Sequence, residues 1–136
     1  MRFAVSVLAL LALASVAACT ARAPEAEPSP TPAGTLANGS FTAELHGFRI
    51  HYEVHGQGPV LMALTNSWGL SLEALRAMYR PLEEKLTLVY FDPRGMGRSG
   101  PVREDAARGM EPVRADSQAL CEHLKLQEVG AIGWSN

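Results

Sequence analysis

The sequence has few cysteines, no excess of basic residues and no apolar run long enough to cross a membrane comfortably. Twelve lysines and arginines stand against 14 aspartates and glutamates, a formal net charge of -2, so nothing indicates nucleic-acid binding through a basic face. No Cys/His cluster has the spacing of metal ligands, and no glycine-rich stretch matches a phosphate-binding loop. We therefore expect neither a metal nor another cofactor.

The N-terminus has the layout of an export signal. Arg2 is followed by the uncharged run Ala4–Ala18, which is shorter than the roughly 20 residues of a transmembrane helix, so residues 1–18 are predicted to be a signal peptide. Val16-Ala17-Ala18-Cys19 resembles the lipobox of bacterial lipoproteins, in which cleavage leaves a lipid-modified cysteine. We expect a protein exported to the bacterial cell envelope and anchored to the membrane at Cys19. The alternative is an ordinary signal peptide and a soluble secreted or periplasmic protein.

The next segment, residues 19–40, reads as the lipidated cysteine and a linker. It is rich in alanine, proline, serine and glutamate and lacks the apolar residues that would offset the entropy of ordering it. The linker would hold a folded domain away from the membrane. Cys121 is then unpaired and is expected to be a small core residue, since a disulfide to a lipidated Cys19 on a flexible tether is disfavoured.

From residue 41 onward the sequence predicts strands that alternate with helices. A hairpin turning at His46-Gly47 is expected first. Strands are predicted at 41–44, 48–54, 60–64, 86–91 and from 128 towards 135. A first helix is predicted at 71–85, capped by Ser71, with Leu72, Leu75 and Met78 as its apolar positions and an interruption at Pro81. A second helix is predicted at 111–124, with Val113, Leu120 and Leu124 directed inward. Such alternation indicates an α/β sheet with helices on both faces.

Three motifs follow successive apolar strands. Thr65–Gly69 (Thr-Asn-Ser-Trp-Gly) follows the first fully apolar strand, and Asp92–Gly100 (Asp-Pro-Arg-Gly-Met-Gly-Arg-Ser-Gly) follows the second. The third is Gly133-Trp134-Ser135 after the last strand. A strand that runs into Gly-x-Ser is the beginning of a Gly-x-Ser-x-Gly nucleophile elbow, in which a tight turn lifts the serine hydroxyl clear of the sheet.

In this order, the three motifs resemble those of the α/β-hydrolase family, over nearly all of residues 41–136. The family usually has His-Gly-x-Gly or His-Gly-Gly-Pro-Gly at the first position, whereas Asn66-Ser67 here looks like the version in 3-oxoadipate enol-lactonases. The resemblance implies the N-terminal half of an α/β-hydrolase: a leading β-hairpin, then β-α-β-α-β with a mostly parallel sheet.

The resemblance also implies roles for single residues. Ser135 would be the nucleophile that forms a covalent acyl intermediate. Two backbone N–H groups would bind the oxyanion, one from Asn136 and the other from Trp68, with Ser67 as the alternative. Losing one such donor typically costs on the order of 3 kcal/mol of transition-state stabilisation.

The turn after the second apolar strand is predicted to be structural. Gly95 and Gly97 permit backbone angles that other residues resist, and Asp92 and Arg94 can tie the turn to neighbouring backbone. The acid of this family follows the nucleophile in the chain, so Asp92 comes too early. No histidine is interpreted as the base: His46 and His55 are assigned to glycine turns, His51 to the polar side of a strand and His123 to a helix.

The resemblance covers only part of a hydrolase, so we expect a fragment of a longer enzyme. Its triad acid and base would lie beyond the sequence, and the 136 residues alone would be inactive and poorly soluble, with an unpaired apolar edge at the last strand. The parent enzyme would act on an ester, a lactone or, like prolyl aminopeptidases, an N-terminal peptide bond. Serine at the elbow disfavours epoxide hydrolases and haloalkane dehalogenases, which have aspartate there. The alternative is a non-catalytic lipoprotein that uses a degenerate hydrolase fold for binding.

Overall fold

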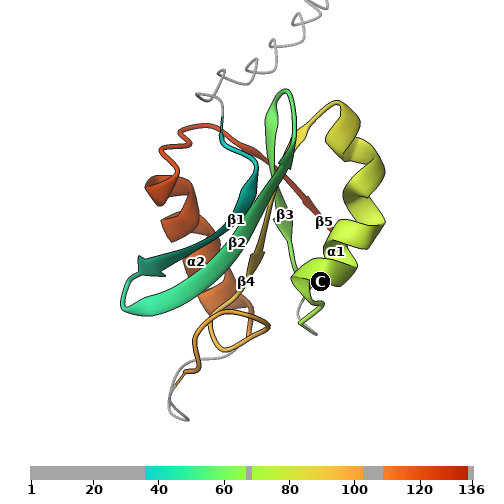
Figure 1. Ribbon diagram of the computed structural model, residues 1–136. Coiled ribbons are helices and arrows are strands. Elements are labelled where there is room, and N and C mark those ends of the chain that lie inside the picture. Colours follow the sequence, from blue (N-terminus) through green and yellow to red (C-terminus); the bar gives the residue numbers. More distant parts are fainter. Residues whose placement is uncertain (1–35, 67–68, 103–108, 135–136) are drawn as a thin grey trace, which may run out of the picture.

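The computed structural model describes residues 36–66, 69–102 and 109–134 (Figure 1). The predicted signal peptide and Cys19 lie outside the described residues, as do Ser67, Trp68, Ser135 and Asn136. The strands are β1 (Gly39–Leu45), β2 (Phe48–Gly56), β3 (Val60–Leu64), β4 (Thr87–Asp92) and β5 (Gly130–Gly133), and the helices are α1 (Leu72–Tyr79), the 3₁₀ helix η1 (Arg80–Glu84) and α2 (Met110–His123).

The predicted hairpin is confirmed. Leu45 pairs with Phe48, so only His46 and Gly47 form the turn between β1 and β2. Both have positive φ, at 50° and 80°, as a two-residue hairpin turn of type I′ requires. β1 starts at Gly39, two residues before the predicted boundary at 41, and Leu36 also packs against the core.

The five strands form one mixed sheet in the order β1-β2-β4-β3-β5. β1, β2 and β4 pair antiparallel, whereas β3 is parallel to both β4 and β5. β4 lies between β2 and β3 although it follows β3 in the chain, and every one of its residues is buried. The strand predicted at 86–91 is therefore present, shifted by one residue, and its central place in the sheet is a finding of the structure.

The two helices cover opposite faces of the sheet (Figure 1). β4 shows this division directly. Leu88 and Tyr90 pack in one cluster with residues of α1, while Val89 and Phe91 pack in a second cluster with residues of α2. Because successive residues of a strand point to opposite faces, each helix packs with every second residue of β4. The predicted α/β arrangement with helices on both faces is thus present.

Helix α1 begins as predicted but buries a different stripe. The Ser71 side chain accepts a hydrogen bond from Ala74 N, 3.3 Å away, which caps the helix. Leu72, Leu75 and Tyr79 are buried, whereas Met78 is 46% exposed. The expectation that Met78 lies on the apolar face was wrong, because spacings of three and four residues bring Tyr79 to that face instead. Near Pro81 the chain continues as η1.

Helix α2 packs through Val113, Asp116 and Leu120, all of them buried. Leu124 comes just after the helix end and is partly buried against the same cluster. Cys121 is also partly buried there, as expected for a small core residue. Neither helix, nor any other in the described ranges, has the length and apolar character to cross a bilayer.

Strand β5 is the last strand of the described sheet and pairs only with β3 there. Ala131 and Trp134 are exposed, the latter by 58%, and Ile132 is partly buried against the α1 side. The predicted unpaired apolar edge is confirmed within the described residues.

Candidate functional site

The three predicted motifs lie at one edge of the sheet. Leu64, the last residue of β3, pairs with Gly133, the last residue of β5, and β3 is also parallel to β4. The carboxyl ends of parallel strands meet at the same edge, so the segments that begin at Thr65, Asp92 and Trp134 leave the sheet together. In open α/β sheets this edge is where ligands bind.

The segment after β3 folds back on itself. The Thr65 hydroxyl donates to Leu70 O at 2.8 Å, and Asn66 Oδ1 accepts from Leu70 N at 3.2 Å. Gly69 N also donates to Asn66 O at 3.1 Å. Thr65 and Asn66 are buried, so two polar side chains hold the ends of this loop close together. The predicted oxyanion donors Trp68 and Ser67 lie between these ends in sequence, outside the described residues.

Asp92 joins the turn after β4 to helix α1. Its carboxylate accepts from Leu72 N at 3.2 Å through Oδ1 and from Arg98 N at 3.0 Å through Oδ2. The side chain is 1% exposed and therefore depends on these donors. The first bond also places a carboxylate at the positive N-terminal end of α1. These contacts are the ties to neighbouring backbone that the sequence suggested for Asp92.

Gly95 and Gly97 have φ of +75° and +49°. At Gly97 an added Cβ would lie 2.4 Å from the Asp92 carboxyl group, and at Gly95 one would lie 2.8 Å from Val102 Cγ2. Glycine is thus favoured at both positions for two reasons: the positive φ, and the close neighbour that leaves no room for a side chain. Ser99 completes the turn: its Oγ donates to Asp92 O and accepts from His51 N at 2.8 Å.

Arg94 is tied to a side chain rather than to backbone, contrary to the expectation. Its backbone N–H donates to Asp116 Oδ2 at 2.9 Å, and its Nε donates to Oδ1 at 2.9 Å. The guanidinium lies 3.9 Å from the centre of the Phe48 ring. Asp116 was not predicted from the sequence. It lies three residues after Val113 and four before Leu120, so an acidic residue falls on the apolar face of the helix, and this was a signal that it has a buried partner.

A second group of charges, also missed, surrounds Glu53 on β2. Its carboxylate binds Arg98 from the turn and His55 Nε2 at 2.8 Å, and lies 3.8 Å from Arg76 of α1 and 3.6 Å from His51 Nε2. Burial raises the pKa of the Glu53 carboxyl, but the hydrogen bonds from His55 and Arg98, with the charge of these groups, outweigh it and leave the pKa below its ordinary value.

The assignment of His55 needs correction, because it lies within β2 and not in a turn. His51 lies on the side of β2 that also carries Glu53 and His55, which is the polar side predicted for it, and it is only 6% exposed. The cause is that both faces of β2 are covered, one by the α2-side core and the other by Arg76, Arg98 and the turn after β4. The spacing of His51, Glu53 and His55 by two residues was the signal that these side chains share one face.

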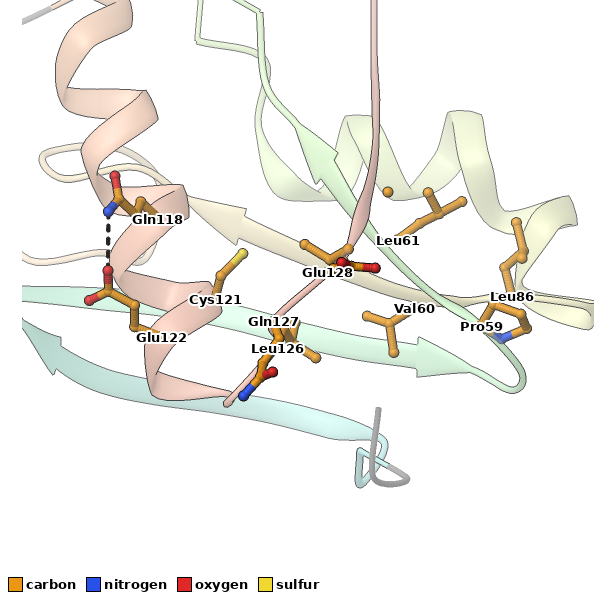
Figure 2. Close-up of a pocket in the computed structure, with 12 residues that line it drawn as sticks. Pro59, Val60, Leu61, Leu86, Gln118, Cys121, Glu122, Leu126, Gln127 and Glu128 are labelled. Carbon is orange, nitrogen blue, oxygen red and sulfur yellow. Dashed lines mark hydrogen bonds between the residues drawn. The ribbon is translucent and has the colours of Figure 1, made fainter. Parts of the chain in front are cut away.

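An open, largely apolar pocket of about 980 Å³ lies at the opposite edge of the sheet. Figure 2 shows that its residues come from the start of β3, from α2 and from the segment that leads into β5. These are the amino ends of the strands, so this pocket is separate from the edge that carries the three motifs.

Two further points concern the predicted chemistry. Within the described ranges, no three histidine, cysteine or carboxylate side chains form a group that could hold a metal ion. A Cβ added at Gly133 would meet only ordinary contact with Leu64, at 3.6 Å. The neighbours in the described part of the chain therefore do not explain the glycine.

Comparisons with known proteins agree with this geometry. No family model matches the chain. It is 32% identical over 116 residues to serine hydrolase BPHL of Mus musculus, and 32% identical over 93 residues to the soluble epoxide hydrolase of Corynebacterium sp. (strain C12). These alignments cover 83% and 67% of the chain but 39% and 31% of the relatives, so the chain spans less than half the length of the curated proteins it matches.

The structure itself is similar to the epoxide hydrolase CorEH, with a TM-score of 0.61 and 28% identity over 71% of this chain and 33% of that one. The serine hydrolase and the epoxide hydrolases are enzymes of the α/β-hydrolase fold, and the matches cover their N-terminal portion. The chain therefore has the α/β architecture of the N-terminal part of α/β-hydrolases and is related to enzymes of that fold.

Proposed function

We propose that this protein is a serine hydrolase that transfers an acyl group through Ser135, from an ester, a lactone or an N-terminal peptide bond. The observation that supports this most is the convergence of three motifs at the carboxyl edge of β3, β4 and β5. Gly133 is the last residue of β5, and Ser135 follows it by two residues, the spacing of a nucleophile elbow.

In this proposal Ser135 attacks the acyl carbon, and the bond to the leaving group breaks as the acyl-enzyme forms. The backbone N–H groups of Asn136 and Trp68, or of Ser67 in place of Trp68, bind the developing oxyanion. Backbone donors suit this task because they are fixed before the reaction and cannot lose a proton. Water then hydrolyses the acyl-enzyme. Epoxide hydrolases are among the relatives, and Ser135 is the residue that separates the proposed acyl transfer from their chemistry.

The test uses the protein expressed from its natural reading frame. Ser135→Ala is expected to abolish hydrolysis of p-nitrophenyl acetate and labelling by a fluorophosphonate probe, whereas Ser40→Ala, an exposed serine of β1, is the matched control and should change neither. Equal hydrolysis by the wild type and Ser135→Ala would contradict the proposal and favour a non-catalytic binding protein. The same assay on the 136 residues alone tests the expectation that they are inactive without an acid and a base from elsewhere.

We also propose that a lipid on Cys19 anchors the protein to the membrane of the bacterial cell envelope. The support is the sequence Val16-Ala17-Ala18-Cys19 after a basic residue and an apolar run. Metabolic labelling with a fatty-acid analogue should mark the wild type but not Cys19→Ser. An unlabelled wild type recovered in the soluble fraction would argue instead for a secreted or periplasmic protein.

A further inference from the structure

We draw no further inference here: the strongest candidate, the open apolar pocket between the start of β3, α2 and the segment that leads into β5 (Figure 2), is a surface for which nothing in the described part of the chain shows what covers it.

Discussion

Asp116, in the middle of α2, accepts hydrogen bonds from both the backbone and the guanidinium of Arg94, in the turn after β4. The Asp116 side chain is 1% exposed and that of Arg94 is 15% exposed. Since the guanidinium also lies over Phe48, this pair connects the turn to α2 on one side and to the hairpin on the other.

Removing the carboxylate should therefore destabilise the fold strongly. Asp116→Ala leaves a largely buried guanidinium and a backbone N–H without their partner, and we expect a loss of about 3–5 kcal/mol in the free energy of unfolding, measured by urea denaturation. Glu111→Ala is the matched control on the same helix, because it removes an exposed ion pair with Arg114 and should have no measurable effect. Similar effects of the two variants would show that burial of the Arg94 pair is unimportant.

Substitutions at two turn glycines separate the energetic cost of a strained backbone angle from the cost of a side-chain clash. Gly47 has φ of +80° and nothing within 4 Å of an added Cβ, whereas a Cβ at Gly97, with φ of +49°, would lie 2.4 Å from the Asp92 carboxyl group. Gly47→Ala should cost about 1–2 kcal/mol of unfolding free energy from the backbone angle alone. Gly97→Ala should cost about 1–3 kcal/mol more, because Asp92 would have to leave the buried Leu72 N–H.

The comparison of these two variants by denaturant titration is the measurement. Equal losses would mean that Asp92 can move without penalty, and that its bonds to Leu72 and Arg98 contribute little to stability.

The charged groups around Glu53 (Arg98, His55, Arg76 and His51), here called the Glu53 cluster, predict that the free energy of unfolding depends on pH. The pKa of Glu53 is lowered in the folded protein, so the folded state holds the ionised form more favourably than the unfolded state does. This contribution is complete above the ordinary pKa of 4.5 and is lost as the pH falls below it through the lowered value. Unfolding free energies between pH 3 and 7 should therefore fall less steeply towards acid for Glu53→Gln than for the wild type.

Arg98→Gln removes one of the groups that lower the Glu53 pKa and should also flatten this acid dependence. An unchanged slope in both variants would show that the cluster does not couple proton binding to folding.

Cys121 should react slowly. Burial raises the pKa of its thiol, and the charge of Glu122 raises it further, so less of the nucleophilic thiolate is present near neutral pH. In a Cys19→Ser background, alkylation by iodoacetamide at pH 8 is expected to be several-fold slower in the folded protein than in urea. Equal rates in the two conditions would contradict this.

Much of the fold could be predicted because its turns, strands and helix starts are determined by residues that are close together in the sequence. His46-Gly47 between alternating segments predicted the hairpin, the run Val60–Leu64 predicted β3 with its observed bounds, and Ser71 predicted the start of α1. Each of these depends on residues close in sequence. Met78 was misplaced because apolar residues at both 78 and 79 satisfy a helical period, and only contact with the sheet selects Tyr79.

The side-chain partners could not be predicted in the same way. Arg94 and Asp116 are 22 residues apart, and Glu53 and Arg98 are 45 apart; nothing local specifies which charges a fold will bring together. Of the predicted site, the ties of Asp92 and the conformations of Gly95 and Gly97 are seen directly. The roles of Ser135, Asn136, Trp68 and Ser67 stay predictions, since these residues lie outside the described part of the chain.

The place of β4 in the sheet has a consequence for how the chain folds as it is made. A ribosome releases the hairpin and β3 before β4, yet neither can reach its inner neighbour until residues 87–92 have emerged. Until then the nascent chain presents two strands, β2 and β3, with open hydrogen-bonding groups, the condition under which chaperones bind and aggregation begins. Synthesis of a six-residue segment thus marks the moment at which this part of the protein can first close.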